Sequence, residues 1–377
     1  MAPLVTAFIY DSYESYRAQG FDAEACEELE KRDTVEAIVR SLEACGHEVV
    51  PVAGIQQLVA ILAEGGHKSW DLAFFTAEGM YGAGREAQVP GLLEAYQIPH
   101  VLSDAATLAL TLDKGLTKIV LEHHGIPTAP FAIIPAILPS NAGSENDNLE
   151  SVIADVLSRS PHADALKQFP LFIKPACEGS SKGIYRFSKV HSTTELVEGV
   201  RQLWARYPDQ NVVVERFLAG AEYTVSVVGT GASARVVGTA HLNWQSARTR
   251  EIREADYSLS YWAIDGDVDK DEYPVCPVNS QDNRPEVQQA EEVALRAWRA
   301  LGCRDTGRID TRCGLDGSPY ILEINAIPGL RPKWSALTVT AESNGIDHEQ
   351  LIRAVVESAL ERYPQLRSKK ESSVLRN

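Results

Sequence analysis

Four side chains near the C-terminal end of the chain have the types and spacing of a metal and anion site. Segment 307–330, GRIDTRCGLDGSPYILEINAIPGL, alternates like two strands joined by the turn residues LDGS. Every second side chain of a strand faces one side, so Arg308 and Asp310 share one face of the first strand. Glu323 and Asn325 share one face of the second strand. If the hairpin register joins these faces, two carboxylates and an amide oxygen offer the hard ligands that Mg²⁺ prefers. The arginine would then suit a negative oxygen that develops during reaction; the alternative is an ordinary solvated hairpin face.

A second stretch, residues 170–187, has the composition of a loop that binds anions. Glycines and small hydroxyl residues leave backbone N–H groups free to wrap anionic oxygens, and Lys174 would add a positive charge. The spacing is neither that of a P-loop nor GxGxxG, and a plain hairpin turn is the alternative. The loop residues proposed to meet a ligand are Glu178, Gly179, Ser180 and Ser181.

Residues 211–229 predict a strand, a short linker and a second strand, with an acid on each side of the linker. Glu215 ends the first apolar run and Glu222 opens the second, flanking Phe217 and Leu218. A carboxylate could bind ribose hydroxyls while the backbone of the linker meets a base. The alternative is a pair of solvated charges at strand ends.

The elements that must position these residues begin with an alternation of strands and helices, which predicts a parallel sheet with helices on both faces. Ligands of such sheets bind beyond the carboxyl ends of the strands, so Glu78, which follows the third strand, is a further candidate; a flexible connection is the alternative.

The predicted N-terminal strands are residues 4–10, 49–52, 71–76 and 98–102, and the helices are 23–45, 55–63 and 87–96. Later in the chain we predict strands at 171–174 and 184–187, helices over 106–123 with a break near Asp113, and helices at 284–301, 334–344 and 348–363. Residues 139–148 predict a surface loop and 242–273 a long loop rich in arginine and aromatic residues.

Bulk properties narrow the class of protein. A chain of 377 residues predicts two or three domains, and a net charge of −16 argues against nucleic acid as a partner. None of the six cysteines forms a CxxC pair, which indicates reduced thiols. No run of residues has the apolar length of a membrane span, and no targeting segment is evident, so we expect a cytoplasmic protein.

Taken together, four motifs resemble the ATP-grasp superfamily, and most closely its D-alanine–D-alanine ligase family. They are LDKGLTK (112–118), LFIKPACEGSSKG (171–183), VVVERFLAGAEYTV (212–225) and GRIDTRCGLDGSPYILEINAIPG (307–329). The resemblance extends over about residues 4–363 and implies an α/β ATP-grasp fold. An N-terminal parallel α/β domain, 1–113, would precede two α+β subdomains, 114–218 and 219–365, that clasp ATP; 366–377 would be a frayed tail.

The resemblance implies a role for each matching residue. Lys114 and Lys174 would contact the ATP phosphates, Glu215 the adenine amino group and Glu222 the ribose. The backbone at 217–218 would cradle the base. Two Mg²⁺ ions would be held by the carboxylates and the amide of the hairpin. Arg308 and Ser180 would be the catalytic residues. Arg308 would stabilise the oxyanion, and Ser180 with its loop would lie over the phosphates near the acyl substrate.

The departures from the family pattern fall on the amino-acid pockets. The run 77–87, AEGMYGAGREA, lacks the histidine that starts the family's first substrate loop, and 242–273 replaces a shorter loop over the site. Residues 330–335, LRPKWS, stand where Met-Thr and small polar residues are usual. The substrate residues we name are therefore Glu27 for an ammonium group, and Arg331 and Lys333 for a carboxylate. Glu78 and Ser335 are further substrate candidates.

The resulting hypothesis is an ATP-dependent carboxylate–amine ligase that joins amino-acid-like substrates through an acyl phosphate. Its cofactors would be ATP and Mg²⁺, and its partners small molecules, with a possible homodimer. Two alternatives stay open: a nucleotide-binding regulatory protein without ligation, and another ATP-grasp reaction such as carboxylation. A nicotinamide dehydrogenase is excluded because no GxGxxG follows the first strand.

Overall fold

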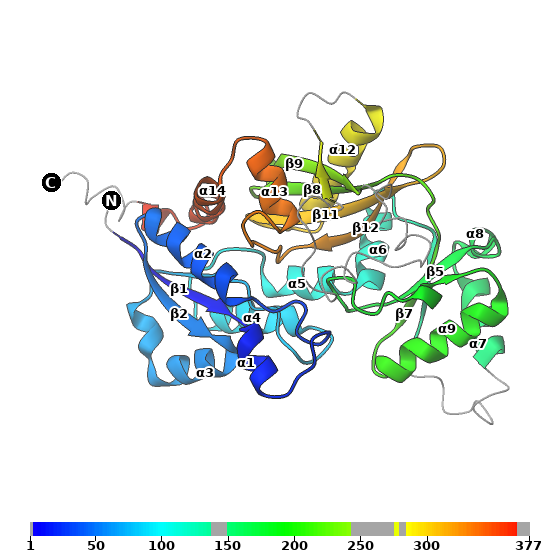
Figure 1. The fold of residues 1–377 in the computed structure, drawn as a ribbon, viewed down its shortest axis with the longest axis horizontal. Coiled ribbons are helices and arrows are strands. Elements are labelled where there is room, and N and C mark those ends of the chain that lie inside the picture. The colour runs from blue at the N-terminus through cyan, green and yellow to red at the C-terminus, as the bar shows by residue number, and fades with distance from the viewer. Residues whose placement is uncertain (1–2, 137–148, 243–274, 279–283, 368–377) are drawn as a thin grey trace.

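The computed structural model describes residues 3–136, 149–242, 275–278 and 284–367. The predicted loop 139–148, nearly all of the loop 242–273 and the tail lie outside these residues. Three sheets are arranged along the longest axis of the molecule, with the helices α5 (Ala105–Leu112) and α6 (Lys114–His123) between them (Figure 1). The predicted break at Asp113 is confirmed, because its side chain caps α6 by accepting from the Leu116 N–H.

The N-terminal sheet is parallel, as predicted, with the strand order β2-β1-β3. Its strands are β1 (Val5–Tyr10), β2 (Glu48–Ala53) and β3 (Leu72–Phe75), and its helices are α1 (Tyr13–Ala18), α2 (Arg32–Ala44), α3 (Gly54–Glu64) and α4 (Gln88–Ala95). The 3-10 turns are η1 (Gly66–Ser69) and η2 (Arg85–Ala87). Fully buried side chains such as Phe8 and Phe74 form its core.

Two N-terminal predictions are wrong in their extent. The helix expected over 23–45 begins only at Arg32, because Glu30 forms a parallel bridge with Ser12 and its N–H donates to the Asp11 carbonyl. Backbone held in that extended pairing cannot continue a helix. The strand expected over 98–102 is reduced to a single bridge at His100, since Leu102 turns away with φ 75°.

The central sheet is antiparallel, with the order β4-β7-β5-β6. It contains β4 (Phe131–Ile134), β5 (Leu171–Pro175), β6 (Lys189–Val190) and β7 (Val212–Arg216), together with α7 (Leu149–Arg159), α8 (Ala163–Leu166) and α9 (Thr193–Arg206). The strand predicted at 184–187 is wrong. Residues Arg186–Ser188 form the 3-10 turn η3, closed by Ser188 Oγ, which accepts from the Tyr185 N–H at 2.9 Å.

The C-terminal sheet has five strands in the order β10-β9-β8-β11-β12. They are β8 (Glu222–Val228), β9 (Arg235–Leu242), β10 (Val275–Pro277), β11 (Thr306–Cys313) and β12 (Pro319–Asn325), with the 3-10 turn η4 (Gly231–Ser233). The helices α12 (Pro285–Ala300), α13 (Ala336–Ser343) and α14 (His348–Leu360) confirm the three predicted ones. Close packing needs glycine at Gly307, where an added Cβ would lie 2.3 Å from the buried Trp298 ring.

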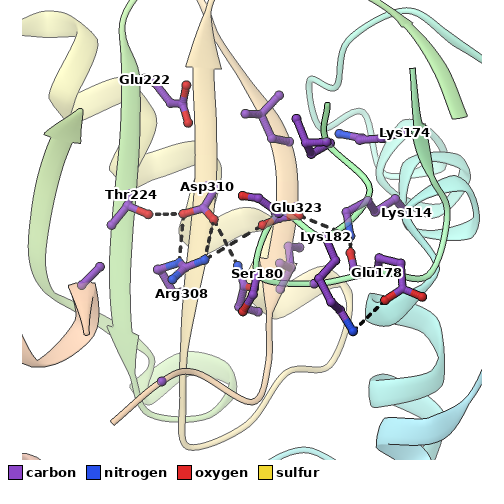
Figure 2. Close-up of a pocket in the computed structure, with 18 of the residues that line it drawn as sticks. Lys114, Lys174, Glu178, Ser180, Lys182, Glu222, Thr224, Arg308, Asp310 and Glu323 are labelled. Atoms are coloured by element: carbon purple, nitrogen blue, oxygen red, sulfur yellow. Dashed lines mark hydrogen bonds and ion pairs between the residues drawn. The ribbon is translucent and has the colours of Figure 1, made fainter. Parts of the chain in front are cut away.

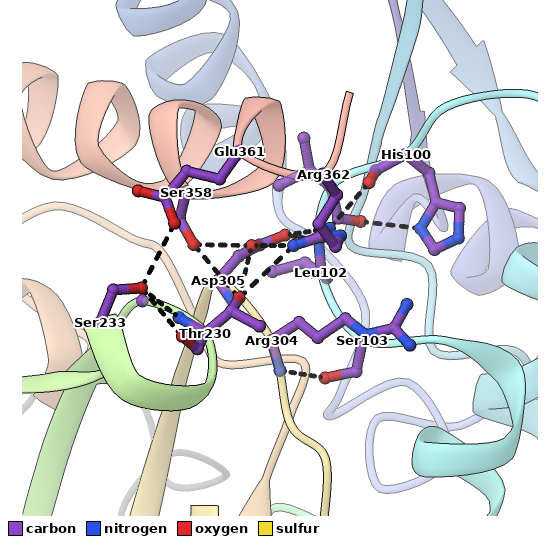
Figure 3. Close-up of polar contacts among 12 residues, drawn as sticks. His100, Leu102, Ser103, Thr230, Ser233, Arg304, Asp305, Ser358, Glu361 and Arg362 are labelled. Atoms are coloured by element: carbon purple, nitrogen blue, oxygen red, sulfur yellow. Dashed lines mark hydrogen bonds and ion pairs between the residues drawn. The ribbon is translucent and has the colours of Figure 1, made fainter. Parts of the chain in front are cut away.

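A buried carboxylate joins the N-terminal and C-terminal parts of the molecule (Figure 3). Asp305, fully buried at the start of β11, accepts from the Leu102 N–H at 2.8 Å and from Ser358 Oγ at 2.8 Å. Arg362 donates to both of its oxygens, at 2.5 and 2.7 Å, and also to the His100 carbonyl. Segments far apart in sequence are thereby held together.

No helix within the described ranges combines the length and apolar character needed to cross a bilayer.

Candidate active site

A cavity of about 1190 Å³ is lined by residues from all three parts of the molecule. Its wall includes residues from the N-terminal part, the loop after β5, the β7–β8 linker and the hairpin β11–β12. Every residue singled out from the sequence as a site candidate lines it except Lys333, which is exposed and has a positive φ of 59°. The motifs far apart in sequence therefore share one enclosure.

The hairpin β11–β12 has the register that brings its polar faces together. Arg308 pairs with Asn325 and Asp310 with Glu323 across the two strands. Arg308 donates from Nε to Asp310 Oδ1 at 3.1 Å and from Nη2 to Oδ2 at 2.9 Å, while Asn325 Nδ2 donates to Oδ2 at 3.1 Å (Figure 2). Thr224 on β8 also hydrogen-bonds Asp310. The convergence of four side chains expected from alternation is present in the fold.

The charges of this cluster indicate a place for a cation. Burial, and then the charge of Glu323, raises the pKa of Asp310 against the opposing influence of Arg308. Glu323 is half-buried, and Lys114, with Nζ 3.3 Å from Oε2, and Lys174 hold its pKa at about 2 against the effect of desolvation. Two carboxylates and an amide oxygen on one face form a hard-oxygen donor set, which fits Mg²⁺. A divalent ion there would relieve the repulsion between the carboxylates.

A buried lysine pair is organised around Glu215 at the end of β7. Lys174 from β5 and Lys118 from α6 each place Nζ 2.8 Å from a Glu215 oxygen. Although burial opposes ionisation, these two ammonium groups hold the pKa of Glu215 at about 2. Lys118 was not proposed from the sequence. The signal was its place one helical turn after Lys114, inside the LDKGLTK motif.

The β7–β8 linker forms an aromatic and cationic edge of the cavity. The Arg312 guanidinium carbon lies 5.0 Å from the centre of the Phe217 ring, and Lys189 Nζ lies 4.5 Å from it. Arg312 also contacts Glu222, with Nη1 3.1 Å from Oε2. The Phe217 ring offers a flat surface for a nucleoside base, and the Glu222 carboxylate beside it could accept from the hydroxyl groups of the sugar.

The loop after β5 is a tight, tethered structure. Ser180 and Ser181 adopt positive φ angles of 45° and 60°, and Lys182 N–H donates to the Gly179 carbonyl at 2.8 Å. Lys114 Nζ donates to the carbonyl of Glu178. An added Cβ at Gly179 would lie 2.2 Å from Glu28 Oε1, so the loop backbone closes directly on the N-terminal part.

That closure is made by an ion-pair network that the sequence reasoning missed. Glu28 contacts Arg85 Nη2 at 3.0 Å and Lys182 Nζ at 2.7 Å, and Lys182 contacts Glu178 at 2.8 Å. Arg85 Nη1 donates to the carbonyl of Cys177 at 2.6 Å. Glu27, the residue named from the sequence, also lines the cavity, but its neighbour Glu28 holds the central position. No sequence signal distinguished two adjacent glutamates in a segment taken to be helical.

Further acids on the same wall have raised pKa values. Burial, and then the charge of Glu28, raises the pKa of Glu86 to about 8. The same two causes place the pKa of Glu78 well above its usual range. Burial also raises the pKa of Glu30 to about 7. This wall is therefore rich in carboxyl groups that keep their protons to an unusually high pH.

The segment after the hairpin has a structural contact that the sequence could not reveal. Arg331 lies 2.7 Å from Asp33 Oδ2 near the start of α2 and 5.3 Å from the Trp334 ring. Ser335 Oγ accepts from the Arg331 N–H at 3.0 Å. Binding of a substrate carboxylate by Arg331 would have to compete with this ion pair.

Comparisons with known proteins agree with this geometry. The family model described as "D-ala D-ala ligase C-terminus" matches residues 120–357. A D-alanine–D-alanine ligase of Xanthomonas axonopodis pv. citri is 32% identical over 86% of this chain and 88% of its own length. One of Cupriavidus pinatubonensis is 30% identical over 85% of each chain.

Solved structures of similar proteins support the fold. The D-alanine–D-alanine ligase of Bacillus anthracis complexed with ATP has a TM-score of 0.64 at 20% identity, over 96% of this chain and 99% of that one. The enzyme of Coxiella burnetii gives 0.64 at 19% identity, over 100% and 99% of the two chains. With its family model, its relatives and its ATP-grasp fold in agreement, the chain belongs to the D-alanine–D-alanine ligase family.

Proposed function

We propose that this protein uses ATP to join the carboxylate of one amino-acid-like substrate to the amine of another, releasing ADP and phosphate. The observation that carries the proposal is the convergence of Arg308, Asp310 and Glu323 with Lys114 and Lys174 in one cavity. Relatives at about 30% identity are D-alanine–D-alanine ligases, which supports the same class of reaction.

Asp310, Glu323 and Asn325 are the residues that would hold Mg²⁺. When bound, Mg²⁺ neutralises phosphate charge and orients the transferring phosphoryl group. Lys114 lines the same cavity, with Nζ 3.3 Å from Glu323 Oε2 and donating to the Glu178 carbonyl, and it would meet phosphate oxygens there. Lys174 stays anchored by Glu215 at the opposite side of the loop.

The reaction has two steps. The substrate carboxylate oxygen attacks the γ-phosphorus of ATP, the bond to the bridging oxygen breaks, and ADP leaves an acyl phosphate. The amine nitrogen attacks the acyl carbon, the C–O bond to phosphate breaks, and phosphate and a proton leave. Lys114 and Lys174 bind the phosphate charge, and Arg308 donates to the oxyanion of the second step. Ser180, at a positive φ in the loop, presents backbone and hydroxyl donors to the acyl group.

The nucleotide end of the cavity belongs to the same proposal. Glu215 and Glu222 would meet the adenine amino group and the ribose, with the base on the Phe217–Leu218 backbone. The ion pair of Glu215 with two lysines keeps it ionised, and an ionised carboxylate accepts strongly from an amino group.

The decisive experiment replaces Arg308 by alanine and measures ATP binding and product formation separately. We expect unchanged nucleotide affinity and a rate of amide formation lower by about 10²–10³, the usual effect of removing one oxyanion donor. Arg235→Ala, an exposed arginine at the start of β9 in the same sheet, is the control and should leave both values unchanged. Equal loss of binding and product formation would contradict the role of Arg308. ATP binding without ADP release from any pair of amino acids would favour a non-ligating nucleotide-binding protein.

Several finer assignments accompany the proposal. The net charge of −16 argues against nucleic-acid partners, and free cysteines among the described residues suit a cytoplasmic protein. A homodimer stays a prediction. The domain boundaries after residues 113, 218 and 365 are proposed because each falls between, or just beyond, the sheets and helices of one part. Lys333, which does not line the cavity, has less support as a carboxylate ligand than Arg331.

A further inference from the structure

The N-terminal wall of the cavity contains more carboxylates than the surrounding cations can neutralise. Glu28 and Glu178 are balanced, because Arg85 and Lys182 pair with both of them at 2.7–3.5 Å. Two acids against two cations form a closed network. Any further carboxylate on this wall therefore adds uncompensated negative charge.

Glu86 and Glu78 are such carboxylates. Glu86, on η2 (Arg85–Ala87), is only 9% exposed, yet it lines the cavity. Within the described part of the chain its carboxylate forms no hydrogen bond or ion pair, and neither does that of Glu78. Glu86 is nine-tenths buried and Glu78 half-buried. A carboxyl group so placed without a partner is costly to ionise, so a ligand that carries a positive charge would stabilise its charged form.

The chemistry of that ligand follows from how the acids are arranged. The described residues include no group of three His, Cys, Asp or Glu side chains placed to hold a metal ion. Glu78 and Glu86 lie at different points of the segment between β3 and α4 and both line the cavity, an arrangement that suits separate ammonium or guanidinium groups of one organic molecule. Glu86 interacts electrostatically with Glu28 and Arg85 and also with Lys114 and Glu323, so it adjoins the proposed phosphoryl-transfer site.

We propose that Glu78 and Glu86 bind a cationic side chain of an amino-acid substrate, so that the substrate class is a diamino or guanidino acid. This inference rests on the proposed ligase function. The α-ammonium of a neutral amino acid can compensate only one carboxylate of this wall, for example Glu27. A second positive charge compensates the others. Alanine, with no side-chain cation, leaves Glu86 buried and unpaired.

The test compares substrates of equal size and different charge on the full chain. Lysine, ornithine and arginine, in both enantiomers, are compared with norleucine, glutamine and alanine. Binding is measured by calorimetry with a non-hydrolysable ATP analogue and Mg²⁺, and turnover by ADP release from pairs of amino acids. We expect lysine to have a dissociation constant or KM at least about 10-fold lower than norleucine, the usual effect of a charged hydrogen bond.

Variants assign the preference to the two residues. Glu86→Gln and Glu78→Gln remove a charge and keep the size, and each should reduce the lysine-over-norleucine preference by about 10- to 100-fold while norleucine is little affected. Glu64→Gln, at the exposed end of α3 and outside the cavity wall, is the control and should leave the preference unchanged. Neither glutamine variant should lower the melting temperature, because each replaces a carboxyl group that is costly to ionise where it stands.

The outcomes separate this inference from the proposed function. Ligation of neutral amino acids with no preference for lysine, or a preference that survives both glutamine variants, would overturn the inference and leave the ligase function standing. Tight binding of lysine that depends on Glu86, with no ADP release from any pair, would support the cation site and contradict the ligase function. Neither binding nor turnover with any amino acid would overturn both.

Discussion

Arg362→Ala is the substitution whose effect on stability follows most directly from the structure. Arg362 follows α14 and donates to both oxygens of Asp305, at 2.5 and 2.7 Å. Asp305 is fully buried and Arg362 is largely buried, with 20% of its side chain exposed. Truncation removes the only cation that contacts this carboxylate among the described residues, while the donors Leu102 N–H and Ser358 Oγ remain.

The expected magnitude comes from the burial of the charge that is left. Breaking a buried ion pair by removing one partner costs about 3–5 kcal/mol. With Thr230 Oγ1, which donates to Asp305 Oδ1 at 3.1 Å, three neutral donors remain. They and the partial exposure of the arginine place this case at the lower end, so we expect a loss of about 3 kcal/mol. Because the same carboxylate joins the N-terminal and C-terminal parts, the loss should be accompanied by looser packing at Leu102.

Urea unfolding followed by circular dichroism measures the loss, and hydrogen exchange at the Leu102 amide locates it. Arg353→Ala is a matched control on the same helix, α14, because Arg353 pairs with Glu349 at 2.8 Å in an exposed position. An exposed pair is worth about 0.3–0.5 kcal/mol. Asp305→Asn combined with Arg362→Ala should restore part of the stability. A loss below about 1 kcal/mol for Arg362→Ala, or one equal to that of the control, would refute the assignment of Asp305 as a buried charged junction.

Three further predictions concern the cavity. Glu215→Gln should cost about 3 kcal/mol in unfolding experiments, because Lys118 and Lys174 lose their shared counter-charge, and adding Lys118→Met should recover part of it; an unchanged stability would contradict the pairing. Burial raises the pKa of the Cys177 thiol to about 12, so iodoacetamide at pH 8 should modify Cys177 at least about 100-fold more slowly than free cysteine, as followed by peptide mass spectrometry; rapid labelling would contradict its burial. Burial also raises the pKa of Glu86 to about 8, so its contribution to stability is fully present below pH 4.5 and is lost as the pH rises through 8. Measured without metal or nucleotide, Glu86→Gln should therefore gain roughly 2–4 kcal/mol relative to wild type between pH 5 and 9, and a constant difference would count against the raised pKa.

The residues of the proposed nucleotide site could be brought together from the sequence because their geometry is local. In the hairpin β11–β12, alternation alone places Arg308 and Asp310 on one face, and a short turn with Gly317 at φ 80° limits the register. The pairing of Asp310 with Glu323 then follows. The order of the four motifs further indicated that distant segments meet. Residues of all four motifs do line one cavity.

The substrate wall was not predictable for the opposite reason. Glu28 becomes central only because the chain near Glu30 pairs with the end of β1, which stops the helix expected there. Arg85 reaches Cys177 across 92 residues of sequence, a tertiary contact that leaves no local pattern. Arg331 likewise appears available in the sequence until its contact with Asp33 is known. Long-range ion pairs between loops are decided by the packing of whole domains and not by periodicity.

The central claim is that the cavity couples ATP cleavage to amide formation, and one measurement tests it directly. ADP and amide product are quantified together for wild type and for Asp310→Asn, with Mg²⁺, in the presence and absence of each amino-acid substrate. The account predicts that wild type forms ADP and amide in equal amounts only when both substrates are present, and that the variant loses both. ADP release at the same rate without amino acids, or full activity of Asp310→Asn, would contradict it.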